Sequence, residues 1–237
     1  MNIFSKKPKA QDQNGVMNTR RQILNKNSSF LVQEAYKTLR TNVRFFLHGK
    51  NCKKFCVTSG VAGEGKSITL INLAISFAEA GNKVLVIDCD LRRPAMARLL
   101  VEKAAPGLSG VLADMEDLEE AIRKDMYPNL DILFSGEIPP NPSELLGSEK
   151  MRSLIEDMSK RYDYILVDTP PVNVVSDACV VANLLDGVLL LVRKDRSRKD
   201  DVKRSVDSLR LTGARILGCV LNGVAVENKS YGYEYKL

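Results

Sequence analysis

The stretch that decides the fold is TSGVAGEGKS, Thr58 to Ser67, which directly follows the apolar run FCV. It satisfies the pattern G-x-x-x-x-G-K-[ST], in which a glycine-rich loop joins a strand to a helix. In that arrangement successive backbone N–H groups and the helix N-terminus point at a phosphate. Lys66 is expected to reach the β and γ phosphates, and the Ser67 hydroxyl to ligate Mg²⁺. The loop therefore predicts binding of a nucleoside triphosphate.

Apolar strand-like runs alternate with helix-like segments along most of the chain. Because continuous apolar strands separated by helices are typical of a parallel sheet covered on both faces, the predicted fold class is α/β, doubly wound. The expected strands are KKFCVT, KVLVID, LDILF, YILVD, GVLLLV and RILGCVLN. The expected helices span 67–80, 148–160, 177–185 and 199–211, preceded by an amphipathic helix at 30–47 with Leu31, Ala35, Leu39 and Val43 on its apolar face.

One folded domain is expected, because 237 residues with 44% apolar content can build a substantial core. It is predicted to span 29–226, between a polar, flexible arm at 1–28 and a flexible tail at 227–237. No window approaches the about 18 apolar residues of a membrane span, which argues against a membrane-spanning or secreted protein. The five cysteines include no CxxC pair and are expected to be buried, reduced thiols in the cytosol.

The charge distribution adds little on its own. A net charge of +6 permits a nucleic-acid or acidic-membrane partner without requiring one. The densest basic cluster is RKDRSRKDDVKR, residues 193–204, which we interpret as the solvated start of a helix.

Three aspartates follow strand-like runs where nucleotide chemistry needs them. KVLVIDCDLRRP places Asp88 at the carboxyl end of a strand and Asp90 two residues later, so both are expected near the edge of the sheet that faces a ligand. YILVDTPP places Asp168 at the end of another strand, in the position of a Walker B carboxylate. Cys89 between the first two is interpreted as an apolar filler on the opposite side of the strand, with a reactive thiol as the alternative.

Together these motifs resemble the cytoplasmic bacterial tyrosine kinases (BY-kinases) encoded with capsular and exopolysaccharide genes, a family of the P-loop ATPase superfamily. The resemblance rests on TSGVAGEGKS, VLVIDCDLRRP and YILVDTPP, with the helix EAYKTLRTN before them and a tyrosine-rich end after them. It covers about residues 29–237 and implies a protein-tyrosine kinase that uses ATP and Mg²⁺.

The resemblance also implies a role for each matched residue. The catalytic residues would be Lys66, Asp88 and Asp90, with Asp88 as the base for the attacking tyrosine. Mg²⁺ would be surrounded by Ser67, Asp88 and Asp168, and Asn222 would face the adenine. The implied nucleotide-binding residues are Gly60, Val61, Ala62, Gly63, Glu64, Gly65, Lys66, Ser67, Ile68 and Asn222. Ala62 stands where many members have proline, which leaves every N–H donor of the loop in place.

The helix at 29–50 and the tail carry the implied assembly. In the family an ExxRxxR motif builds a subunit ring, and it appears here as Glu34, Lys37 and Arg40; lysine at the second position loses bidentate pairing. The tail places Tyr231, Tyr233 and Tyr235 within five residues. Because eleven extended residues reach about 35 Å, we predict autophosphorylation of these tyrosines between subunits. An edge strand with alternating aromatic residues is the alternative for this segment.

The remaining implied partners follow from the same resemblance. They are a separate membrane protein whose cytoplasmic C-terminal segment stimulates the kinase, protein tyrosine substrates and a cognate phosphatase, with no nucleic acid expected. The chain would then be cytoplasmic and peripheral at the inner face of the cell membrane, regulating capsular or exopolysaccharide synthesis and export.

Two other functions are compatible with a phosphate loop. An ATP-switched partition or septum-positioning ATPase would carry an additional lysine where this chain has Val61, and would end in a basic or amphipathic helix. A small-molecule kinase or metal-cluster carrier would need a lid or a cysteine pair; the only long irregular region is 91–129, and no CxxC is present.

Overall fold

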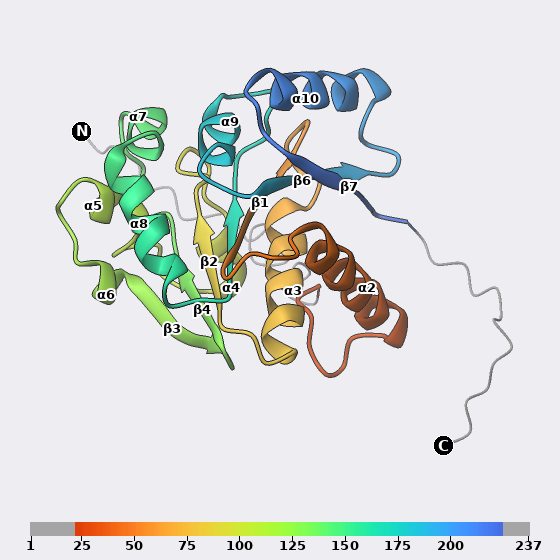
Figure 1. The fold of residues 1–237 in the computed structure, drawn as a ribbon, viewed down its shortest axis with the longest axis horizontal. Helices are drawn as coiled ribbons and strands as arrows, with labels where there is room; N and C mark the ends of the chain where they lie inside the picture. The colour runs from red at the N-terminus through yellow and green to blue at the C-terminus, as the bar shows by residue number, and fades with distance from the viewer. Residues whose placement is uncertain (1–21, 225–237) are drawn as a thin grey trace, which may run out of the picture.

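The computed structural model describes residues 22–224, which form one seven-stranded sheet with the order β3-β4-β2-β5-β1-β6-β7 (Figure 1). Neighbouring strands pair in parallel, except that β3 runs antiparallel to β4 at one edge. The predicted doubly wound α/β fold is therefore confirmed. The strands are β1 (Lys53–Ser59), β2 (Val84–Asp88), β3 (Ile122–Tyr127), β4 (Leu130–Leu133), β5 (Tyr164–Asp168), β6 (Gly187–Arg193) and β7 (Ile216–Asn222).

The helices lie on both sides of this sheet. The five long segments expected from periodicity are all helical, within a few residues of the expected ends: α2 (Phe30–Phe46), α3 (Lys66–Glu79), α8 (Glu149–Ser159), α9 (Asp177–Ala182) and α10 (Lys199–Leu211). Four short helices and the strand β3 were not predicted. These helices are α4 (Met96–Leu100), α5 (Leu108–Leu112), α6 (Leu118–Ala121) and α7 (Pro142–Leu146).

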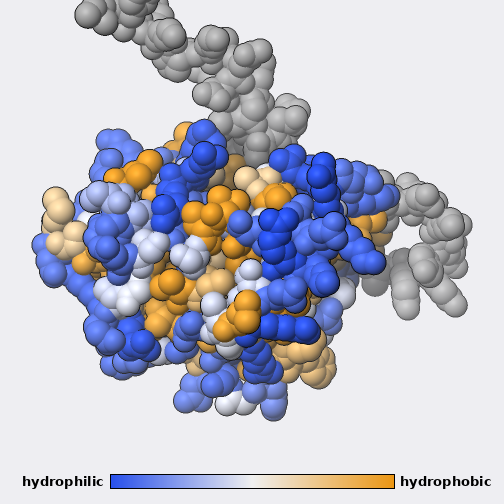
Figure 2. All heavy atoms as spheres, turned by 90° about the horizontal axis from the view of Figure 1, so that it is seen from above, coloured by the Kyte–Doolittle hydropathy of each residue, from blue (hydrophilic) through white to orange (hydrophobic). Residues whose placement is uncertain are grey.

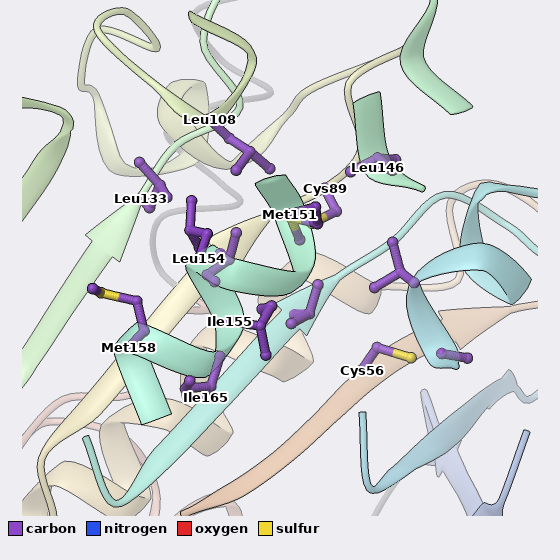
Figure 3. Packing of buried hydrophobic residues seen from close by; sticks show 14 of the residues in the cluster. Cys56, Cys89, Leu108, Leu133, Leu146, Met151, Leu154, Ile155, Met158 and Ile165 are labelled. Carbon is purple, nitrogen blue, oxygen red and sulfur yellow. The ribbon is translucent and has the colours of Figure 1, made fainter. Parts of the chain in front are cut away.

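Two hydrophobic clusters fill the two faces of the sheet, because successive residues of a strand point to opposite sides. In β2, Leu85 and Ile87 belong to the cluster under α5 to α10, whereas Val84 and Val86 belong to the cluster under α2, α3 and α4. Figure 3 shows the first cluster, where Met151, Leu154, Ile155 and Met158 of α8 pack near Ile165 of β5. The sheet is thus covered on both faces and exposes its carboxyl edge to ligands.

The folded region begins earlier than expected. Ile23 and Leu24 are buried, and the Leu24 backbone N–H donates to Oδ1 of Asn72 on α3 at 2.8 Å. Ile23 and Leu24 therefore pack against the domain, although they fall within the predicted arm at 1–28. The predicted tail at 227–237 lies outside the described residues.

The cysteines differ from the expectation at one position. Cys52, Cys56, Cys89 and Cys179 are buried free thiols, and Cys89 lies in the core as predicted. Cys219 is exposed, because it lies on β7 at the uncovered edge of the sheet. Seen from above, the surface is mostly hydrophilic, with small groups of hydrophobic residues between (Figure 2). Within residues 22–224, no helix combines the length and apolar content needed to cross a bilayer.

Candidate nucleotide site

The phosphate loop joins β1 to α3 and is held in a conformation that only glycine adopts easily. Gly63 and Gly65 have φ angles of 79° and 97°, in the left-handed region. Gly65 is the N-cap of α3, so the free N–H groups of that helix's first turn face the loop. Lys66 is buried, with 8% of its surface exposed, and among residues 22–224 it has no ion-pair partner. The loop therefore presents amides and an unpaired ammonium to an anion.

Two carboxylates lie side by side at the carboxyl edge of the sheet. Asp88 ends β2 and Asp168 ends β5, and the two residues are paired in register. The Ser67 hydroxyl donates to Oδ2 of Asp168, and Oδ1 of Asp88 accepts the Asp90 N–H at 3.1 Å. The other two oxygens, Asp88 Oδ2 and Asp168 Oδ1, are buried without a hydrogen-bond partner. Unsatisfied buried carboxylate oxygens are rare, because each carries a desolvation cost.

Burial makes both carboxyls weak acids in the metal-free protein. The pKa of Asp88 lies well above its ordinary value, first because the group is buried and second because Asp168 carries a like charge. Burial also raises the pKa of Asp168 to about 6, although Lys66 and the Ser67 hydroxyl act in the opposite direction. The pair is therefore electrostatically unfavourable until a cation binds.

The orphaned oxygens fit a magnesium ion. Mg²⁺ prefers oxygen ligands, and proteins usually hold it through one or two carboxylates together with water and substrate phosphates. Ser67, Asp88 and Asp168 are brought together as predicted and supply such a set. Within residues 22–224 there is no group of three or more His, Cys, Asp or Glu side chains suited to a metal, so nucleotide and water would complete the coordination.

A cleft of about 470 Å³ opens beside the loop. The phosphate loop lines one side, Asp90 and Arg93 line a second, and Pro170, Pro171 and Val174 form an apolar wall. Asp90 thus faces the cleft, whereas Asp88 lies beneath it and is fully buried.

Arg92 also lines this cleft, and its guanidinium is anchored to a buried carboxylate. Its Nε donates to Oδ2 of Asp177 at 2.7 Å and its Nη2 donates to Oδ1 at 3.1 Å. Ser143 donates to the same carboxylate at 2.6 Å. Burial alone would raise the pKa of Asp177, but hydrogen bonds from Arg92 and Ser143 outweigh it and lower the pKa. The segment that carries Asp90 is therefore tied to α7 and α9, a link that the sequence did not predict.

The side of the loop away from Asp168 has its own partners. The Asn222 Nδ2 donates to the Glu64 carbonyl at 2.9 Å, and the Val61 N–H donates to the Glu64 carboxylate at 3.2 Å. Contact between Asn222 and adenine stays a prediction. Arg193 and Arg196 also donate to loop carbonyls, which sequence reasoning missed although both open the basic run at 193–204. Both arginines are exposed, as the interpretation of that run expects, but they precede α10 and bind the loop instead of starting the helix.

The residues assigned to a subunit ring make contacts within the chain. Glu34 and Lys37 form an exposed ion pair at 2.7 Å along α2. Nη1 of Arg40 donates to the Ser76 carbonyl and, at 3.2 Å, to the Ser76 hydroxyl. Arg40 therefore links α2 to α3 of the same chain, and its role in a ring stays a prediction.

Comparison with known proteins identifies the class to which this site belongs. The sequence model of an AAA domain family matches residues 52–192. The chain is 38% identical over 204 residues to the tyrosine-protein kinase YwqD of Bacillus subtilis, covering 86% of each chain. It is 34% identical over 205 residues to the putative tyrosine-protein kinase CapB of Staphylococcus aureus, covering 86% of this chain and 90% of that one.

The solved structures agree. The kinase domain of the Escherichia coli tyrosine kinase ETK has a TM-score of 0.79 at 34% identity, covering 90% of this chain and 88% of that one. The septum site-determining protein MinD of Pyrococcus horikoshii has a TM-score of 0.61 at 27% identity, covering 72% of this chain and 70% of that one. Fold and site thus define a P-loop ATPase.

Within that superfamily, the chain belongs to the bacterial tyrosine-protein kinases (BY-kinases), and it is a protein-tyrosine kinase. The septum-positioning ATPases share its fold at lower similarity.

Proposed function

We propose that this kinase binds ATP with Mg²⁺ at the phosphate loop and transfers the γ-phosphoryl group to tyrosines of the C-terminal tail of a neighbouring subunit. The observation that carries this proposal is the pair of orphaned oxygens on Asp88 and Asp168, beside Ser67 and the loop. Bound Mg²⁺ supplies charge neutralisation at the β and γ phosphates. The Lys66 ammonium would add a second positive charge at the same phosphates.

The protein must also accept a proton. A tyrosine hydroxyl has an ordinary pKa near 10, so it is protonated at neutral pH and needs an acceptor as its oxygen attacks the γ phosphorus. The bond from that phosphorus to the β–γ bridging oxygen breaks, and ADP leaves. We assign the proton to Asp88, the residue that the family resemblance implies as the base. Asp90 in the cleft is assigned to orient the acceptor hydroxyl.

The apolar wall of the cleft suits an aromatic acceptor. Pro170, Pro171 and Val174 line the cleft beside the loop, and Val174 is 65% exposed. A tyrosine ring placed there would bury this surface while its hydroxyl faces the phosphates. Tyr231, Tyr233 and Tyr235 are the proposed acceptors and lie outside the described residues.

The proposed setting is capsular or exopolysaccharide synthesis and export, and the proposed assembly is a ring built through α2. A membrane activator and a cognate phosphatase complete the proposal. Its support is the similarity to the kinases above and to the chimerical protein CapA2B2, which has a TM-score of 0.75 at 34% identity and covers 78% of this chain and 82% of that one.

The test is phosphate transfer by the purified chain from a host without other tyrosine kinases. With ATP and Mg²⁺, the wild type should become phosphotyrosine-positive, and Lys66→Met should lose the signal, because the ammonium at the phosphates is gone. Lys124→Met removes a lysine that is 60% exposed at the surface and serves as the matched control. Release of inorganic phosphate without labelled tyrosine, or labelling of Lys66→Met, would overturn the proposal.

A further inference from the structure

Two side chains from the ends of β6 and β7, and one from the turn after β6, hold three successive carbonyls of the phosphate loop. Arg196 donates from Nε and Nη2 to the Ala62 carbonyl at 3.2 and 2.9 Å. Arg193 donates from Nη1 to the Gly63 carbonyl at 3.1 Å. Asn222 donates to the next carbonyl, that of Glu64, at 2.9 Å. We call these three side chains, Arg193, Arg196 and Asn222, the outer brace.

The planarity of the peptide bond gives these contacts a directional consequence. In a trans peptide unit the C=O and the following N–H point in opposite directions. Carbonyls held outward by the outer brace therefore turn the N–H groups of Gly63, Glu64 and Gly65 to the other side of the loop. Gly63 and Gly65 line the cleft beside Lys66, so their amides belong to the surface that receives phosphate.

Two glycines of the loop leave room for side chains of the outer brace. A Cβ added at Gly63 would lie 2.8 Å from Nη2 of Arg196, and one added at Gly65 would lie 2.5 Å from Nδ2 of Asn222. Distances under about 3 Å are closer than real Cβ contacts come. Glycine at these positions thus admits the side chains as well as the positive φ angles.

The outer brace is itself fixed to the sheet. Arg193 and Asn222 are paired in register at the ends of β6 and β7, and the Lys194 N–H donates to the Asn222 carbonyl at 2.9 Å. The Arg193 N–H donates to the Ser197 hydroxyl at 2.7 Å, and that hydroxyl donates to the buried Glu64 carboxylate. The backbone that carries Arg193 and Asn222 is therefore fixed at the edge of the sheet, and Arg196 lies in the turn that follows β6.

We propose that the outer brace is a positioning element that orients the phosphate-binding amides before the nucleotide arrives. The inference rests on the nucleotide binding stated under Proposed function and adds residues that act through the loop backbone. Preorganised donors bind more tightly because ordering is not required on binding. The start of the basic run at 193–204 thus has a specific role in nucleotide affinity.

The test measures binding of Mg²⁺–ADP by calorimetry. Arg193→Ala and Arg196→Ala should each raise the Kd about tenfold, which is the order of effect of one hydrogen bond made by a charged group. Arg198→Ala removes the same charge from an exposed neighbour that makes no side-chain bond to the loop, and should leave the Kd within about twofold. Arg196→Lys keeps the positive charge but loses the paired Nε and Nη2 donors of the guanidinium. Its affinity for Mg²⁺–ADP should remain severalfold weaker than that of the wild type.

A second readout needs no nucleotide. In the nucleotide-free protein, the ¹⁵N–¹H resonances of Gly63, Glu64 and Gly65 should shift in Arg196→Ala and stay in place in Arg198→Ala. Equal ADP affinity and unchanged amide resonances in Arg193→Ala and Arg196→Ala would overturn the outer brace, as would full recovery by Arg196→Lys. Absence of ADP binding in the wild type would instead overturn the proposed function, and the amide resonances would still decide the inference.

Discussion

Asp88 and Asp168 occupy paired positions on neighbouring parallel strands, and each keeps one buried oxygen without a hydrogen bond. Adjacent strands lie about 4.8 Å apart, so two ionised carboxylates here repel strongly in a site that water does not reach. The folded, metal-free protein therefore holds protons at this site that the unfolded chain has already released.

This retention predicts an unusual pH dependence of stability. The folded pKa of Asp168 is about 6, above the ordinary 3.8, and that of Asp88 is also raised. Between about pH 4 and 6 the folded state binds more protons, so the free energy of unfolding contributed by Asp168 falls as pH rises, by up to about 3 kcal/mol. Urea unfolding in EDTA across this range should show the fall relative to the double variant Asp88→Asn, Asp168→Asn. A free energy of unfolding of the wild type that rises with pH relative to that of the double variant would contradict this explanation.

The same repulsion predicts that one substitution stabilises the protein while removing its metal response. In EDTA at pH 8, Asp88→Asn should be more stable than the wild type by about 1–2 kcal/mol, because a buried like charge is gone. Mg²⁺–ADP should raise the Tm of the wild type and have little effect on the variant. Asp207→Asn, at an exposed position on α10, is the matched control and should respond as the wild type does. A variant that is less stable in EDTA and still responds to Mg²⁺ would disprove the metal role.

The Arg92–Asp177 ion pair predicts a large stability effect on one of two adjacent arginines. Asp177 is fully buried, so Arg92→Ala leaves an uncompensated charge and should lower the free energy of unfolding by about 2–3 kcal/mol. Asp177→Asn in that background should recover part of the loss. Arg93→Ala, whose side chain is exposed, should change it by less than about 0.5 kcal/mol in the same urea titration. Equal effects of the two arginines would show that the pair does not anchor this segment.

Variants of Arg40 and Lys37 can distinguish a contact within the chain from a contact between subunits. Because Arg40 bonds to Ser76 of α3, Arg40→Ala should destabilise the chain by about 1–2 kcal/mol even at concentrations where it is a monomer. Lys37→Ala removes half of an exposed ion pair and should cost under about 1 kcal/mol. The measurement is urea unfolding of each variant at a concentration where its mass in solution is that of a monomer. If Arg40→Ala alters only oligomer mass, the residue acts between subunits alone.

The tail assignment predicts loss of labelling without loss of nucleotide chemistry. Replacing Tyr231, Tyr233 and Tyr235 together with phenylalanine should abolish most phosphate incorporation, because the attacking hydroxyls are gone. Binding of Mg²⁺–ADP should be unchanged. The four remaining tyrosines, Tyr36, Tyr127, Tyr162 and Tyr164, serve as internal controls, and the seven tyrosines can be distinguished by mass spectrometry of phosphopeptides. Undiminished labelling of the variant would place the acceptors elsewhere.

The sequence predicted those parts of the molecule that depend on local pattern. Strands ending in Asp88 and Asp168 and the loop before Lys66 have fixed periods and spacings, so the sheet and the phosphate site followed from them. Strand β3 was missed because IRKDMY carries charges and pairs at an edge, where one side faces solvent. Arg92 with Asp177, and Arg196 with the loop, join residues 85 and 134 positions apart in the chain. No local pattern encodes such long-range pairs.

The close fit of Gly63 against Arg196 also limits how this protein can diversify. The phosphate-loop motif accepts any residue at position 63, yet here a methyl group would collide with a guanidinium. Shortening residue 196 would remove this collision but not the φ angle of 79° at position 63, which disfavours any residue with a Cβ. Descendants of this sequence should therefore keep glycine at 63 even where residue 196 has changed.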